Sequence, residues 1–330
     1  MMNEILTSDI TDYLENKNIW IVGHKGMVGS ALCRVLQNIN CNVLELDRTE
    51  IDLRQRFAVD AWVESKKPDL VVVAAAKVGG ILANSQQPVT FLNDNLQIQD
   101  SVINACANHS VEKLLFLGSS CIYPKHAEQP IEESSLLTGK LEPTNEWYAI
   151  AKIAGVKLCQ AYQQERGLNF ISAMPTNLYG PNDNFDPNSS HVLPGMMGKF
   201  HTAKESGAEA VTLWGTGNPK REFMHVDDLA TACLFLLAKY DGIEPINVGS
   251  GEEVSISELA QLISKSVGFQ GEIEFDKTKP DGTPRKLLSS ERLQQLGWQA
   301  STGIQRGIEQ TYEWFLENEL EDYSKRVSNV

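Results

Sequence analysis

The chain has 330 residues, of which 42% are hydrophobic and 22% charged, as in an ordinary globular protein. A formal net charge of −14 excludes nucleic acid as an expected partner, because binding to phosphates needs a basic face. No apolar run approaches the roughly 20 residues of a membrane span, and Met1 to Lys17 lacks the basic start and apolar middle of a signal peptide. We therefore expect a cytoplasmic protein with no membrane partner, built as one large domain with an appended lobe or as two domains.

The cysteines are scattered and form no C-x-x-C pair, which favours reduced thiols over a disulfide framework or a zinc site. No metal is expected. Five of the six are expected to be small apolar core residues, with Cys121 as the exception; the full set is Cys33, Cys41, Cys106, Cys121, Cys159 and Cys233.

The first glycine-rich segment follows a short apolar run. Residues 1–17 show little periodicity and are expected to form an N-terminal extension, after which residues 18–22 read as a strand and residues 30–37 as a helix. Between them stands G-x-x-G-x-x-G, where backbone N–H groups and a helix N-terminus receive a pyrophosphate. This placement predicts a dinucleotide site, with a structural turn as the alternative. The loop consists of Gly23, His24, Lys25, Gly26, Met27, Val28 and Gly29.

The second predicted strand, residues 42–46, decides between two cofactors. Asp47 at its end would hold a ribose 2′-hydroxyl and suggest NAD, whereas Arg48 would hold a 2′-phosphate and suggest NADP. Lys25 in the glycine loop adds a second cation, so the pattern favours NADP(H), although either cation can instead be a solvated surface charge. Asp52 follows where an adenine contact is common in such folds.

Further strands and helices alternate along the first half of the chain. Residues 70–76 are apolar throughout, as expected of a strand covered on both faces, and a helical pattern spans residues 89–107. The next strand, residues 113–117, ends at the Gly118-Ser119-Ser120-Cys121 segment. This alternation predicts a doubly wound parallel sheet of the α/β class, in which ligands bind at the carboxyl ends of the strands.

A tyrosine and a lysine then stand four residues apart, at Tyr148 and Lys152, so a helix places them on one face. We expect the Lys152 cation to lower the pKa of the Tyr148 phenol toward the working range. The Ser119 hydroxyl, from a strand end, would share a hydrogen bond with a carbonyl that Tyr148 protonates, which is the chemistry of ketone reduction. Such a pair also occurs by chance on amphipathic helices.

The rest of the chain contributes the expected substrate side. A strand at residues 170–174 ends in the turn 175–181, which faces the nicotinamide, and the polar loop 182–190 leads to His191. Residues 18–180 are expected to form the NADP-binding Rossmann domain, with strand elements to about residue 250, and residues 181–330 mainly a substrate lobe. A basic cluster suits a diphosphate, with a solvated loop face as the alternative: Lys220, Arg221, Lys277, Lys279, Arg285 and Lys286.

These motifs resemble the extended short-chain dehydrogenase/reductase superfamily and, more closely, its GDP-L-fucose synthase family. The resemblance rests on the glycine loop, Ser119, the Tyr148–Lys152 pair and the segments 74–81, 117–125, 177–181 and 280–285. It implies conversion of GDP-4-keto-6-deoxy-D-mannose to GDP-L-fucose, by epimerisation at C3 and C5 and NADPH-dependent reduction at C4.

The resemblance also implies a role for individual residues. Its catalytic residues fall on Ser119, Tyr148 and Lys152, with Cys121 as epimerisation base and His191 as acid. Its remaining cofactor contacts fall on the glycine loop, Arg48, Asp52, Leu117, Gly118, Ser119, Ser120, Lys152, Pro175, Thr176, Asn177, Leu178 and His191. Its substrate contacts fall on Lys199, Trp214, Arg221, Asp281 and Arg285. Lys25 and Lys199 stand where arginine is expected and would make point contacts in place of bidentate ones.

Three alternatives remain at this stage. A nucleotide-sugar dehydratase needs a pair of carboxylic acids after the catalytic serine, where this chain has Ser120 and Cys121. A plain 4-epimerase has no use for Cys121 or His191, and a non-catalytic NADP-binding sensor could lose Tyr148 or Lys152 without harm. The superfamily commonly forms dimers through helices such as residues 89–107 and 148–166, so a homodimer is expected.

Overall fold

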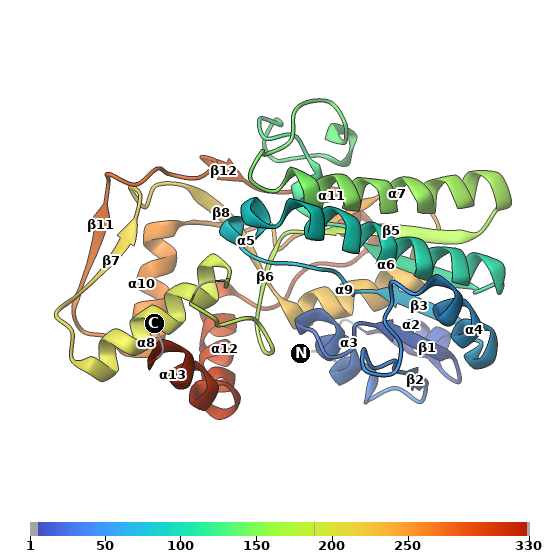
Figure 1. The fold of residues 1–330 in the computed structure, drawn as a ribbon, viewed down its shortest axis with the longest axis horizontal. Coiled ribbons are helices and arrows are strands. Elements are labelled where there is room, and N and C mark those ends of the chain that lie inside the picture. The colour runs from blue at the N-terminus through green and yellow to red at the C-terminus, as the bar shows by residue number, and fades with distance from the viewer. Residues whose placement is uncertain (1–5, 188, 329–330) are drawn as a thin grey trace.

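A computed structural model describes residues 6–187 and 189–328. Its centre is a six-stranded parallel sheet in the order β2-β1-β3-β4-β5-β9 (Figure 1). The strands are β1 (Asn18–Val22), β2 (Asn42–Leu44), β3 (Leu70–Val73), β4 (Lys113–Leu117), β5 (Asn169–Pro175) and β9 (Ile246–Val248). The chain leaves β1 for β2 and returns to β3 on the other side, so the ligand crevice lies beyond the carboxyl ends of β1 and β3. The predicted doubly wound α/β sheet is confirmed.

Helices cover both faces of this sheet. Because side chains alternate along a strand, Ile19 and Ile21 of β1 join one apolar cluster, while Trp20 and Val22 join the other. The first cluster contains α2 (Ser8–Leu14), α3 (Met27–Leu36) and α9 (Val226–Lys239); the second contains α4 (Arg56–Lys66), α6 (Pro88–Asn108) and α7 (Glu146–Arg166). Within the N-terminal segment, Ile10 and Leu14 of α2 are buried in the first cluster.

The second lobe surrounds a third apolar cluster. Strand β8 (Lys220–His225) is the centre of a small sheet and pairs with β6 (Asn177–Tyr179), β10 (Glu253–Ser255) and β12 (Arg285–Lys286). A separate parallel pair joins β7 (Ala210–Trp214) to β11 (Glu272–Asp276). The helices are α8 (Val192–Ser206), α10 (Ile256–Val267), α12 (Ile304–Asn318) and α13 (Leu320–Ser328), on the left of Figure 1.

Short elements complete the chain. These are α5 (Ile81–Gln86), α11 (Glu291–Leu296) and the 3-10 turns η1 (Ser120–Ile122) and η2 (Glu133–Ser135). Strand β3 ends at Val73 and is shorter than the apolar run 70–76 predicts, because Ala75 packs against the glycine loop. No helix among the described residues is long and apolar enough to cross a membrane. The described part of the chain also contains no group of three His, Cys, Asp or Glu side chains placed to hold a metal ion.

Candidate active site

The glycine loop has the shape of a cradle for a pyrophosphate. Gly23 has φ +89°, and a Cβ there would lie 2.9 Å from the Ala75 Cα, while a Cβ at Gly29 would overlap the Gly23 carbonyl. Gly26 differs, because a Cβ there would meet only the Gly23 oxygen, at 3.5 Å. Gly26 is also the N-cap of α3, and no side chain caps this end of the helix. The N-terminal N–H groups of α3 can therefore face an anion that approaches over Gly26.

Charges at the end of β2 are arranged to accept a further phosphate. Asp47, the residue that would favour NAD, forms an ion pair with Lys25 and accepts hydrogen bonds from the backbone N (2.9 Å) and Oγ1 (2.8 Å) of Thr49. Arg48 is exposed beside it. Because Asp47 is neutralised by Lys25, the open cation at this position is Arg48, which fits a 2′-phosphate.

Asp52, the expected adenine contact, is already bound within the chain. Its carboxylate accepts from Nε (3.0 Å) and NH2 (2.6 Å) of Arg54. The Arg54 guanidinium lowers the pKa of Asp52 to about 2. This carboxylate therefore fixes the loop after β2 through Arg54.

Ser119, Tyr148 and Lys152 meet at the end of β4. Lys152 is 3% exposed, and its Nζ donates a hydrogen bond of 2.8 Å to the Leu117 carbonyl. The same Nζ lies 5.8 Å from the centre of the Tyr148 ring, as the helical spacing predicts. A side-chain hydrogen bond joins Ser119 to Tyr148. The hydroxyl, phenol and ammonium thus form one unit at the crevice.

The electrostatics of this unit differ from the expectation that Lys152 lowers the pKa of Tyr148. Burial raises the pKa of Tyr148, the charge of Cys121 raises it further, and only the hydrogen bond from Ser119 opposes them. Burial also lowers the pKa of Lys152 to about 7. Desolvation acts on both Tyr148 and Lys152, and the spacing of the two residues in the sequence does not predict it.

Cys121 lies beside the same tyrosine, in the η1 turn that follows β4. It is half-buried, its backbone N donates to Ser119 Oγ (3.2 Å), and its Sγ accepts from Nδ2 of Asn145 (3.2 Å). Lys286 of β12 places its Nζ 3.8 Å from the sulfur. The thiol is therefore held at the crevice by residues of both lobes.

His191 is the N-cap of α8 and keeps exposed surface, yet desolvation by surrounding protein atoms lowers its pKa. The segment before it touches the loop after β3, where the Gly80 N donates to the Ser189 carbonyl (3.2 Å). Among the described residues, no hydrogen bond or ion pair joins the His191 ring to Cys121 or Tyr148. The structure thus places His191 at the start of α8 without direct contact to the other predicted catalytic side chains.

The expected nicotinamide-side turn is anchored both to β9 of the central sheet and to β8 of the second lobe. The backbone N of Thr176 donates to the Val248 carbonyl (3.0 Å), and Asn177 Nδ2 donates to the Glu222 carbonyl (2.8 Å). Pro175 ends β5, and Leu178 lies in β6 between Asn177 and Tyr179. These bonds fix the path of residues 175–178 where they pass the crevice.

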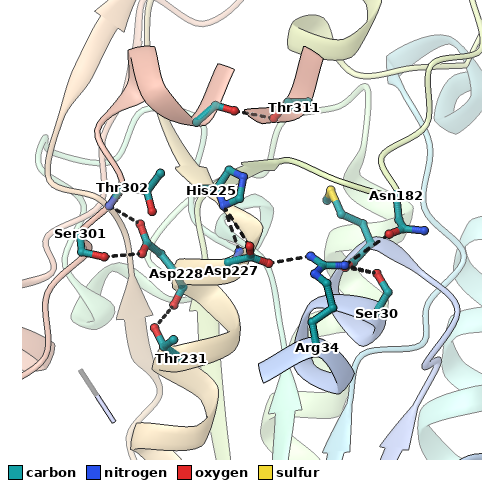
Figure 2. Close-up of polar contacts among 12 residues, drawn as sticks. Ser30, Arg34, Asn182, His225, Asp227, Asp228, Thr231, Ser301, Thr302 and Thr311 are labelled. Carbon is teal, nitrogen blue, oxygen red and sulfur yellow. Dashed lines mark hydrogen bonds and ion pairs between the residues drawn. The ribbon is translucent and has the colours of Figure 1, made fainter. Parts of the chain in front are cut away.

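A polar network ties the cofactor-side helix α3 to the same region (Figure 2). Arg34 of α3 forms an ion pair of 2.6 Å with Asp227 and donates to Asn182 Oδ1 at 3.4 Å. Asp227 N in turn donates to His225 Nδ1 (3.3 Å), which caps α9. The glycine-loop helix, the start of loop 182–190 and α9 are therefore held in one arrangement.

The expected substrate residues all lie in the second lobe. Lys199 of α8 donates to the Thr212 carbonyl of β7 (2.9 Å), and Trp214 ends β7 with 73% of its surface exposed. Asp281 acts electrostatically on Arg221 and raises its pKa, while burial, the larger effect, lowers it.

Asp281 and Arg285 also have hydrogen-bond partners within the second lobe. Asp281 accepts from the backbone N (2.8 Å) and Oγ1 (2.7 Å) of Thr216, and Arg285 Nε donates to Glu253 (2.7 Å). Arg221 is half-buried and donates from NH1 to the Lys220 carbonyl (2.7 Å). Trp214, in contrast, keeps most of its surface exposed, and Asp281 and Arg285 shape the loop near it.

Comparisons with known proteins show the family of this chain. The sequence model of the NAD dependent epimerase/dehydratase family matches residues 19–249. GDP-L-fucose synthase 1 of Arabidopsis thaliana is 55% identical over 319 residues, which cover 96% of this chain and 99% of the relative. GDP-L-fucose synthase of Escherichia coli is 49% identical over 316 residues, which cover 93% and 98%. The chain belongs to the GDP-L-fucose synthase family.

A solved structure of a GDP-L-fucose synthetase has the same fold. A GDP-L-fucose synthetase from Naegleria fowleri, bound to NADP, superposes with a TM-score of 0.84 at 31% identity. The match covers 92% of this chain and 95% of that one. The fold described here is therefore the fold of a solved member of the GDP-L-fucose synthase family.

The sequence does not predict the contacts of two residues at the site of this chain, Asn145 and Lys286. Asn145 carries no pattern beyond its place before the Tyr148 helix, and its contact to Cys121 spans 24 residues. Lys286 was grouped with cations for a diphosphate, but its side chain contacts a sulfur 165 residues away in the chain. The sequence shows that Lys286 belongs to a basic cluster. It does not show that Lys286 contacts Cys121.

Proposed function

We propose that the protein is a GDP-L-fucose synthase, which converts GDP-4-keto-6-deoxy-D-mannose to GDP-L-fucose with NADPH. The observation that carries the proposal is the position of Cys121. Its backbone N donates to Ser119 Oγ at 3.2 Å, and both Cys121 and Ser119 lie close enough to Tyr148 to alter the pKa of the phenol. A thiol therefore accompanies the two donors that grip a keto oxygen, as a combined epimerase and reductase requires.

Epimerisation follows from the acidity of the protons beside a ketone. The Cys121 thiolate removes the proton from C3 or C5, and the electrons of the C–H bond move to O4 as an enolate. Tyr148 and Ser119 donate hydrogen bonds to that oxyanion. His191 returns a proton on the opposite face, which inverts the carbon. Because desolvation lowers the His191 pKa, its proton is more readily given up than that of an exposed histidine.

The reduction step uses the same donors. NADPH, when bound, supplies a hydride to C4. Tyr148 gives its proton to O4, and its raised pKa keeps the phenol protonated until that transfer. Lys152, held on the Leu117 carbonyl, positions the phenol.

The residues present fit NADPH. The open face of Gly26 and the α3 N-terminus would hold the pyrophosphate, and Arg48 the 2′-phosphate. Residues 117–120 and 175–178, which end β4 and β5, would line the nicotinamide side, together with Lys152 and His191. Residues 18–180 thus mainly serve the cofactor.

Residues 181–330 mainly serve the GDP-sugar in this proposal. Lys199 and Arg221 would bind the diphosphate and Trp214 would pack on the nucleoside, with Asp281 and Arg285 shaping the loop around them. The proposal extends to a cytoplasmic homodimer. The dimer is supported by exposed apolar surface on α6 and α7, from Val89 (74% exposed), Trp147 (38%) and Ile150 (41%).

Other functions on this scaffold lack their residues. A dehydratase has no carboxylic acid at Ser120 or Cys121, and a plain 4-epimerase leaves Cys121 unused. A non-catalytic NADP-binding sensor has no need of the buried Lys152 beside Tyr148, whose desolvation is costly. The intact set favours the synthase.

The test is turnover of GDP-4-keto-6-deoxy-D-mannose by purified protein in D₂O with NADPH. We expect NADPH oxidation and a GDP-L-fucose product that carries deuterium at C3 and C5. In Cys121→Ser, deuterium uptake should disappear while C4 reduction remains measurable. No turnover by the wild-type protein would favour the sensor, and unchanged deuterium uptake in Cys121→Ser would remove this residue from the role of base.

A further inference from the structure

The sulfur of Cys121 has a set of partners that a buried apolar cysteine does not need. Asn145 Nδ2 lies 3.2 Å from Sγ and Lys286 Nζ lies 3.8 Å from it, so both neighbours present N–H donors. A neutral thiol is a weak acceptor, whereas a thiolate accepts strongly from amides and cations. The two contacts match the charged form of the side chain.

Lys286 is held in this position from both sides. Strand β12 pairs in parallel with β8, which sets Lys286 beside Arg221 in the register. The next residue, Leu287, donates its N to Gln129 Oε1 (2.9 Å), and its carbonyl accepts from the Ile131 N (2.8 Å). The strand is thus joined to the segment that follows η1, and Lys286 cannot swing freely away from Cys121.

The direction of the side chain separates Lys286 from the other cations of the basic cluster. Neighbours in a strand point to opposite faces, and Arg285 points to Glu253 (2.7 Å) while Lys286 points to Cys121. Lys220 also turns to Glu253, at 3.3 Å. Of these three, only Lys286 brings its positive charge to the thiol.

We propose that Lys286 and Asn145 are positioning residues for the epimerisation base: Lys286 stabilises the Cys121 thiolate, and Asn145 fixes the direction of its lone pairs. The proposal rests on the function proposed above, in which Cys121 removes the C3 and C5 protons. Tyr148 from α7 and Lys286 from β12 are titratable groups beside this residue, and the neutral Asn145 donates to its sulfur. The cation is therefore placed where it favours a negative charge on the sulfur.

The experiment measures the alkylation rate of Cys121 by iodoacetamide, an uncharged reagent, in the full-length protein without substrate, followed by mass spectrometry of the Cys121 peptide. The thiolate is the reactive form and a nearby cation favours it, so Lys286→Met should be alkylated about tenfold more slowly near neutral pH. The rate should recover at high pH, where every thiol is ionised. Lys286→Arg keeps the charge and should retain most of the rate.

The matched control is Lys220→Met, which removes the same charge from the same lobe without contact to the sulfur. Its alkylation profile should equal that of the wild-type protein. Equal profiles for Lys286→Met and the wild type would overturn the proposal. So would a raised KM for the GDP-sugar in Lys286→Met with unchanged alkylation, because Lys286 would then be a diphosphate ligand. Lys286→Gln serves as the second variant if Lys286→Met does not fold.

Failure of this proposal and of the proposed function can be told apart. Alkylation needs no GDP-sugar, so a Lys286-dependent thiol in a protein without turnover would refute the synthase and keep the pair. Turnover with deuterium uptake, together with an alkylation rate that does not depend on Lys286, would support the synthase and refute the role of Lys286. Asn145→Ala should lower deuterium uptake in substrate more than it lowers the alkylation rate, since direction matters for the fixed sugar and little for a small mobile reagent.

Discussion

Lys152 offers a quantitative test of the electrostatics, because its side chain is 3% exposed and has no carboxylate partner among the described contacts. Burial lowers its pKa from 10.5 to about 7. Each pH unit between those values corresponds to about 1.4 kcal/mol, so the folded protein bears a cost of up to about 5 kcal/mol when Lys152 is charged. Replacement by an apolar side chain of similar length should remove this cost.

The sign of the pH dependence follows from proton counts. Between pH 7 and 10.5 the unfolded chain keeps a proton on Lys152 that the folded protein has lost, so stability rises with pH. Below pH 7 both states carry the proton, and the full cost is present. Lys152→Met should therefore be more stable than the wild type at low pH, and the difference should shrink as the pH rises toward 10.5.

The measurement is thermal unfolding of cofactor-free protein from about pH 6.5 to about pH 9. With an unfolding entropy of about 2.1 cal/mol/K per residue, 330 residues give about 1.4 °C in Tm for each kcal/mol. Loss of the hydrogen bond to the Leu117 carbonyl costs the variant about 1–3 kcal/mol, which reduces its gain in stability. The variant should therefore melt about 3–6 °C higher than the wild type at the acid end. The difference should fall by about 4 °C over the two pH units above neutrality.

Lys157→Met is the control, since Lys157 is exposed on the same helix α7. It should show a small difference in Tm that does not change with pH. A Lys152→Met protein that is less stable at the acid end, or whose advantage stays constant with pH, would refute the reasoning. The same variant should lose C4 reduction, so this side chain costs stability and is kept for its function.

Two further predictions concern the cofactor. Arg48→Ala should raise the KM for NADPH at least about tenfold and leave the KM for NADH nearly unchanged, because the guanidinium reads the 2′-phosphate; equal effects on both, measured by steady-state kinetics, would exclude that role. Gly29→Ala should lower the free energy of unfolding by about 1–3 kcal/mol in denaturant titrations and weaken NADPH binding, because its Cβ would overlap the Gly23 carbonyl. Gly303→Ala, where no atom lies within 4 Å of the added Cβ, should leave NADPH binding unchanged and should cost only about 1 kcal/mol or less, because alanine caps the N-terminus of α12 less well than glycine.

The sequence predicts the sheet well because its strands are buried on both faces. The runs at Leu70–Val73 and Leu114–Leu117 are apolar throughout, and few other structures suit such short runs between helical patterns. Helix-period spacing likewise predicts the Tyr148 and Lys152 pair. These features are local, so their physical cause lies within a few residues of the chain.

The features that depend on distant contacts were not predictable. Burial reverses the expected effect on the pKa of Tyr148, and burial is a property of the packed protein. The contact of Lys286 with Cys121 depends on β12 joining β8 and then the segment after η1, which no spacing in the sequence reveals. A cation cluster in a sequence predicts anion binding in general and does not identify which anion.

The division of the site between the lobes separates the two reactions. Ser119, Tyr148 and Lys152 all belong to the sheet domain and hold one another without help from the second lobe. Cys121 instead depends on β12, through Lys286 and through the bond from Leu287 N to Gln129. If Cys121 is the epimerisation base as proposed, a change that loosens β12 should slow epimerisation before it slows reduction, since only epimerisation would need a thiolate that the second lobe helps to hold.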